Sequence, residues 1–218
     1  KNISGEYRPL TSYFGEEVKE EDAKQGKEAQ TAYYVSDEKK QAQYIKMFRD
    51  AGMDAIVCDT YIDPHFISYL EYKNPTRVKF MRIDADVDGA LKEENGEDKE
   101  IEEIFTAALG KKKVKIKTEK LKNAAVPAIV NVSEFMRRMS EMNSFYQMGE
   151  APEDLTLVVN TANAAVLALK GAEEEKRSRS AIQIYYLALL AYRQLTSEEW
   201  DVFTEANTAL IENYLKKE

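Results

Sequence analysis

The chain has 218 residues, of which 44% are hydrophobic and 32% are charged, and its formal net charge at pH 7 is −8. This length allows one large domain or two small ones, and the acidic balance argues against binding to nucleic acid or anionic membranes, because both favour basic surfaces. The single cysteine, Cys58, excludes an internal disulfide and favours a buried, reduced thiol in a cytoplasmic protein.

The first part of the chain alternates strand-like and helix-like segments after a polar lead-in over residues 1–30. Ser36 is expected to cap the first helix, and Gly52 is expected to end it. This alternation predicts a small α/β unit with a parallel sheet. The expected segments are strand 31–35, helix 36–52, strand 53–58, helix 63–72 and strand 77–83.

A charged, glycine-containing stretch over residues 92–100 separates this unit from the rest of the chain. We therefore expect two domains, 1–95 and 96–218. The second domain is predicted to be α+β, because strand-like segments are mixed with amphipathic helices and two helices close the chain. The expected segments are helix 97–110, strands 112–121, 127–132 and 153–160, an amphipathic helix over 133–148, and helices 180–195 and 197–217.

The two closing helices are apolar over much of their surface. Large side chains surround most of helix 180–195, and in the last helix large residues recur every three or four positions as a seam. The helices either cover the core of their own domain or pair with a second copy as a dimeric four-helix bundle, which we favour. The residues expected at this interface are Ile184, Leu187, Leu190, Trp200, Phe203, Leu210, Ile211 and Tyr214.

The segment 133–148 concentrates methionine and aromatic residues. At helical spacing, Phe135, Met139 and Met142 fall within a narrow arc, and Met136 lies on its flank. Periodicity alone favours the buried face of a helix. An exposed face of this composition would instead form an adaptable binding surface, because methionine is unbranched and polarisable.

Few residues suggest chemistry. The stretch DADVDG (84–89) resembles the start of a calcium-binding loop, but the twelfth position holds Asn95 in place of glutamate. His65 is the only histidine, and neither glycine-rich phosphate-binding motif occurs. We therefore assign no catalytic residue and no metal ligand.

The order of segments over nearly the whole chain resembles the bacterial branch of the ninety-kilodalton heat-shock chaperones. GMDAI (52–56) and IDPHFISYL (62–70) are similar to the end of the family's middle domain. VPAIV (126–130), the methionine-rich helix after it and EDLTLVVN (153–160) are similar to its C-terminal domain. The two closing helices match the family's dimerisation element.

This resemblance implies a fragment without the family's ATP-binding domain, so ATP and Mg²⁺ would belong to the parent protein and no cofactor is expected here. It implies a homodimer that contacts non-native client proteins and other chaperones, with neither nucleic acid nor a membrane as partner. The client-binding residues that it implies are Phe66, Phe135, Met136, Met139 and Met142.

Three functions are compatible with the sequence. The favoured one is a cytoplasmic chaperone fragment that is not itself an enzyme, although its parent protein would be an ATPase. The alternative is a calcium- or nucleotide-regulated acidic α/β enzyme domain. The third is a purely structural oligomerisation domain in which the methionine-rich helix is buried.

Overall fold

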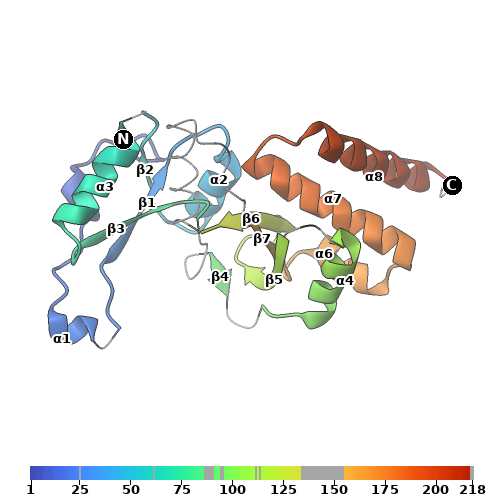
Figure 1. Ribbon diagram of the computed structural model, residues 1–218, viewed down its shortest axis with the longest axis horizontal. Helices are drawn as coiled ribbons and strands as arrows, with labels where there is room; N and C mark the ends of the chain where they lie inside the picture. The colour runs from blue at the N-terminus through green and yellow to red at the C-terminus, as the bar shows by residue number, and fades with distance from the viewer. Residues whose placement is uncertain are drawn as a thin grey trace. The chain divides into compact units, whose positions relative to one another are not determined.

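The chain divides into two compact units, Lys1–Asp86 and Val87–Glu218, each of which mixes helices with a small sheet (Figure 1). This confirms the expected α+β class. The division precedes the boundary expected at residue 95, and the short strand β4 (Lys92–Glu93) pairs with a strand of the second unit. The computed structural model describes residues 1–24, 26–60, 62–85, 91–93, 96–110, 112, 114–133 and 155–216.

The first unit is built on a three-stranded parallel sheet in the order β2-β1-β3, as the alternation of segments predicts. Cys58 lies in its core with Tyr34 and Phe80, which confirms the expected buried thiol. The elements of this unit are η1 (Leu10–Tyr13), α1 (Glu20–Ala23), β1 (Gln30–Val35), α2 (Ala42–Asp50), β2 (Ile56–Val57), α3 (Asp63–Lys73) and β3 (Val78–Arg82).

Helix α2 begins later than the sequence predicts. The side chain of Gln41 accepts hydrogen bonds from the backbone N–H groups of Ser36 and Asp37 and so holds residues 36–41 in a turn. Ser36 therefore does not cap the helix. The apolar face of α2 packs on the sheet, where Phe48 meets Tyr33 of β1 edge-on at 4.9 Å between ring centres.

The second unit contains a four-stranded mixed sheet in the order β4-β5-β7-β6, in which only the β5–β7 pair is parallel among the described strands. None of the helices in the described part of the chain is both long and apolar enough to cross a bilayer. The remaining elements are α4 (Lys99–Leu109), β5 (Val114–Leu121), β6 (Ala128–Val132), β7 (Leu155–Asn160), α6 (Ala164–Ala168), η2 (Leu169–Gly171), α7 (Glu174–Tyr192) and α8 (Ser197–Leu215).

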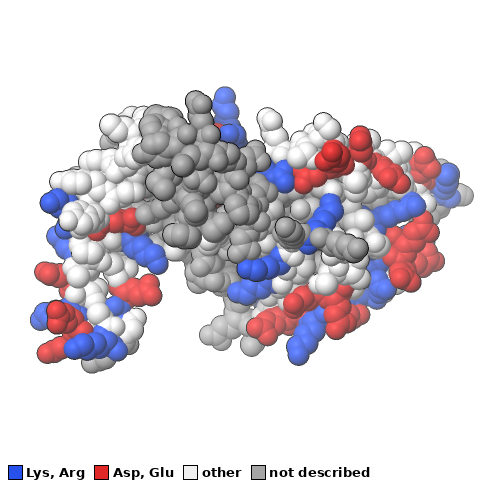
Figure 2. Space-filling model, viewed as in Figure 1, with Lys and Arg blue, Asp and Glu red and all other residues white. Residues whose placement is uncertain are grey.

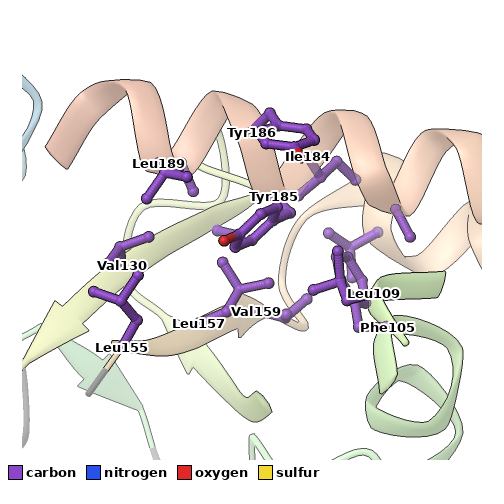
Figure 3. Close-up of a cluster of buried hydrophobic side chains, with 14 of the residues drawn as sticks. Phe105, Leu109, Val130, Leu155, Leu157, Val159, Ile184, Tyr185, Tyr186 and Leu189 are labelled. Atoms are coloured by element: carbon purple, nitrogen blue, oxygen red, sulfur yellow. The ribbon is translucent and has the colours of Figure 1, made fainter. Parts of the chain in front are cut away.

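Helix α7 covers one face of this sheet (Figure 3). Tyr185 and Leu189 of α7 are buried with Val130 of β6 and Leu157 of β7, and Phe105 of α4 closes the adjacent side. Helix α8 packs along α7 on the side away from the sheet (Figure 1). The sheet, α4 and α8 together explain why α7 is apolar around most of its circumference.

The buried polar residue Asn160 ties β7 to the loop that leads into β6. Its side-chain oxygen accepts hydrogen bonds from the backbone N–H groups of Leu121, at 3.0 Å, and Ala162, at 2.9 Å. Its amide nitrogen donates to the carbonyl groups of Asn123, at 3.0 Å, and Val126, at 2.7 Å. The side chain therefore uses its full hydrogen-bonding capacity on the backbone.

Candidate interaction surfaces

Some of the large apolar residues of α8 face the core of the unit, and others face solvent. Phe203 packs against the core of the unit, and Leu210 is half-buried beside the buried Ala206. By contrast, Trp200 and Ile211 on the adjoining side of the helix are 46% and 51% exposed. The chain itself thus covers only part of the seam.

The open part of this seam continues to the end of α8. Tyr214, two helical turns beyond Asn207, is 80% exposed, and Leu215 beside it is also exposed. On the face of α8 that Figure 2 shows, acidic side chains are separated by uncharged ones. We define the pairing surface as the exposed residues Leu187, Trp200, Ile211, Tyr214 and Leu215.

The three residues predicted for the interface on α7 have different environments. Leu187 is exposed, Leu190 packs partly against the core, and Ile184 is only 8% exposed. Ile184 therefore serves the core of its own unit and has little surface to offer a partner in this conformation. Ile184 lies on the face of α7 that is turned away from solvent. Because the helix is apolar nearly all round, the spacing of its large residues does not tell this buried face from an exposed one.

The turn between α7 and α8 is held firmly. Arg193 donates to both carboxylate oxygens of Glu199, at 2.8 and 3.0 Å, and this hydrogen bonding lowers the pKa of Glu199 below its usual value. Thr196 and Glu199 form a capping box at the start of α8. The ion pair and the capping box therefore fix the turn by which α8 follows α7.

A polar pair lies between the two helices. The amide nitrogen of Gln183 on α7 donates to the side-chain oxygen of Asn207 on α8 at 3.3 Å, whereas the buried oxygen of Gln183 has no hydrogen-bond partner among the described residues. A polar pair in an apolar seam costs stability but favours one register, because a shifted register would leave both groups unpaired. We infer that this pair fixes how α8 lies along α7.

Helix α3 in the first unit presents a second exposed apolar face. Phe66, predicted to contact clients, is 48% exposed, and Ile62, Tyr69 and Tyr72 are also exposed at helical spacing on either side of it. The ammonium group of Lys73 lies 5.7 Å from the ring centre of Tyr69 and 5.8 Å from that of Tyr72. We call Ile62, Phe66, Tyr69 and Tyr72 the α3 stripe.

Sequence reasoning found only Phe66 of this stripe, because the resemblance drew attention to one position. The spacing of Ile62, Phe66 and Tyr69, with Ile67 and Leu70 on the buried side, was the signal that would have found the others. The predicted client-binding residues Phe135, Met136, Met139 and Met142 lie within 134–154, outside the described residues.

The groups that suggested chemistry have structural roles where they are described. Both carboxylate oxygens of Asp84 accept hydrogen bonds from Arg82, so this carboxylate is already occupied. The other predicted calcium-loop positions, 86–89 and 95, lie outside the described residues, which contain no group of three side chains suited to a metal ion. Burial raises the pKa of the Cys58 thiol to about 12, so the thiolate is scarce at neutral pH.

No protein-family model matches the chain, but curated proteins do. The chaperone protein HtpG of Porphyromonas gingivalis is 30% identical over 177 residues, which cover 72% of this chain and 25% of the relative. HtpG of Bacteroides fragilis is 30% identical over 167 residues, with 68% and 24% covered, and HtpG of Bacteroides thetaiotaomicron is 30% identical over 159 residues, with 65% and 23% covered. The chain spans about a quarter of the length of these curated relatives.

Proposed function

Since the chain belongs to the HtpG chaperone family over the part that it shares with these relatives, we propose that it is the self-associating, client-contacting part of a chaperone. Its role is then in protein folding under stress, in the cytoplasm. We assign ATP and Mg²⁺ binding to the parent protein and not to residues of this chain, which is not itself an enzyme. Other chaperones are further proposed partners.

The observation that carries the proposal of self-association is the pairing surface on α7 and α8. Each large apolar side chain that leaves water contributes about 1.5–3 kcal/mol, so several on one rigid helix pair form a strong contact surface. We propose that a second copy covers this surface about a two-fold axis, which yields a four-helix bundle. A two-fold arrangement uses each exposed residue twice.

The proposed contact with non-native proteins rests on the α3 stripe. Aromatic side chains with few rotatable bonds provide contact area at low entropic cost, and an exposed apolar face of this kind is otherwise a liability in a monomeric protein. We extend the client-contact proposal to Phe135, Met136, Met139 and Met142, whose composition suits adaptable binding.

Sedimentation of the full chain over a dilution series tests self-association. The variant Ile211→Asp places a charge on the pairing surface, and we expect the dissociation constant to rise more than about 100-fold, because two apolar contacts are lost per dimer. Val202→Asp is the matched control, since Val202 is 39% exposed but lies on another side of α8. A wild-type chain that sediments as a monomer at every concentration refutes the proposal.

Binding of a fluorescently labelled, permanently unfolded reporter protein tests client contact. Replacement of Phe66 and Tyr69 by serine should weaken this binding and leave the fold intact, because both side chains are exposed. Tyr7→Ser is the matched control, since Tyr7 is 84% exposed in the same unit but lies outside the stripe. Equal binding by the two variants would exclude the α3 stripe as a contact surface.

A further inference from the structure

Lys112, in the turn between α4 and β5, reaches the inner side of the α7–α8 pair. Its ammonium group donates a hydrogen bond to the hydroxyl group of Tyr186. It also lies 4.2 Å from the ring centre of Tyr186 and 5.2 Å from that of Tyr185, within the range of cation–π attraction. One charge therefore contacts two neighbouring aromatic residues of α7.

The contact between Lys112 and Tyr186 matters for stability because Tyr186 is fully buried. A buried phenol normally requires a hydrogen-bond partner, and a hydroxyl that loses its partner carries the full cost of desolvation. Lys112 supplies that partner from outside the helix pair. Removal of the ammonium group therefore disturbs α7 at a position that cannot relax toward solvent.

Tyr186 is linked to α8 by two successive contacts between aromatic rings. Phe203 of α8 meets Tyr186 edge-on, with ring centres 6.2 Å apart and an interplanar angle of 77°. Trp200 in turn meets Phe203 edge-on at 5.4 Å and 79°. Each pair has the geometry that aromatic rings prefer. A continuous series of contacts thus joins Lys112 to the half-exposed Trp200 of the pairing surface.

The same charge acts on the start of α8 through Glu199. Hydrogen bonding to Arg193 is the main cause of the lowered pKa of Glu199, and the positive charge of Lys112 also favours its ionised form. Glu199 closes the capping box of α8 and precedes Trp200 directly. The aromatic contacts of Lys112 lead to Trp200 and its electrostatic effect acts on Glu199, so both act on the first turn of α8.

We propose that Lys112 is a positioning residue for self-association: through Tyr186, Phe203 and Glu199 it holds the first turns of α8 in the orientation that presents Trp200 to a partner. The proposal rests on the self-association proposed above for α7 and α8. Loss of the charge on Lys112 lowers the fraction of chains in this orientation and weakens pairing by the same factor.

The test compares Lys112→Met, which removes the charge and keeps an unbranched side chain, with Lys112→Arg, which keeps the charge. Lys176→Met on an exposed part of α7 changes the net charge equally and serves as control. The readouts are the dissociation constant from sedimentation over a dilution series and the emission spectrum of Trp200, the single tryptophan, in the full chain. Circular dichroism verifies that each variant is folded.

We expect Lys112→Met to raise the dissociation constant about tenfold and to shift the emission of Trp200 to the red, while Lys112→Arg and Lys176→Met stay near wild type. The double variant Lys112→Met/Tyr186→Phe should regain part of the loss, because it leaves no buried hydroxyl unpaired. Such recovery would not follow if Lys112 acted only as a surface charge.

Unchanged pairing and unchanged Trp200 emission in Lys112→Met would overturn the inference, even with a stable wild-type dimer. If the wild-type chain does not self-associate, the proposed function fails separately, and the emission of Trp200 in the monomer still decides whether Lys112 positions α8. If Lys112→Met fails to fold, the double variant Lys112→Met/Tyr186→Phe replaces it, because it also lacks the ammonium group and its ring contacts; part of the red shift is then expected, and emission equal to wild type would overturn the inference.

Discussion

Replacement of Asn160 by alanine tests the packing of the second unit at one buried side chain. The substitution removes four hydrogen bonds to backbone groups at Leu121, Asn123, Val126 and Ala162. At a net contribution of about 0.5–1.5 kcal/mol for each of the four bonds, the free energy of unfolding should fall by about 2–6 kcal/mol. That is a large share of the roughly 5–15 kcal/mol by which a domain is stable.

Denaturant unfolding followed by the fluorescence of Trp200 measures this effect, because Trp200 lies in the same unit as Asn160. Protein concentration is held constant, since self-association would add to the apparent stability. Asn213→Ala, at an exposed position on α8, is the matched control and should change the stability by less than about 0.5 kcal/mol.

A second variant at the same site separates hydrogen bonding from loss of volume. Asn160→Asp keeps the oxygen that accepts from Leu121 and Ala162, but it turns a carboxylate toward the carbonyl groups of Asn123 and Val126. Burial raises the pKa of such a carboxylate, so the deficit relative to wild type should shrink as the pH falls and the group becomes protonated. A loss below about 1 kcal/mol for Asn160→Ala would refute the assigned network.

Three further outcomes follow from the structure. Gly96→Ala should lower the melting temperature markedly, because an added Cβ would lie 2.0 Å from the backbone nitrogen of Lys120. The hydrogen bond from Lys170 lowers the pKa of Asp98, the N-cap of α4. The ionised carboxylate of Asp98 therefore stabilises the fold above the ordinary carboxylate pKa, and this stabilisation is lost as the pH falls through the lowered pKa. Lys170→Met should reduce this acid dependence of the unfolding midpoint. Cys58 should react with a thiol reagent at the rate of unfolding rather than at the rate of a free thiol, which a time course of labelling measures.

The sequence predicted most elements where side-chain periodicity and end signals agree. The strands of the first unit belong to this class. The start of α7 was missed, because residues 174–179 carry charges and no apolar period. The helix extends there with an ion pair between Glu175 and Arg179 at 2.7 Å, one turn apart, and this pattern resembles a solvated loop in sequence.

The start of α2 shows a different limit. Ser36 is a good N-cap residue by type, but Gln41 reaches back to the N–H groups of Ser36 and Asp37 and forms a turn before the helix. Asp37, rather than Ser36, accepts hydrogen bonds from the backbone N–H groups of Lys39 and Lys40 in this turn. Local propensity therefore gave the helix correctly and its first residue wrongly.

The pairing surface shows the most general limit. A spacing of three and four residues identifies an apolar stripe on a helix, but it does not say which neighbour covers the stripe. On α8 the stripe is wider than one neighbour can cover, so α7 takes Phe203 and leaves Trp200 and Ile211 exposed. The exposed Trp200 is in ring contact with Phe203, which packs against the core, so a shift of Phe203 would also move Trp200. The same residues that complete the core of one chain therefore set the geometry that a second copy would meet, and for this reason we expect substitutions behind α8, such as Lys112→Met, to change pairing without touching the partner.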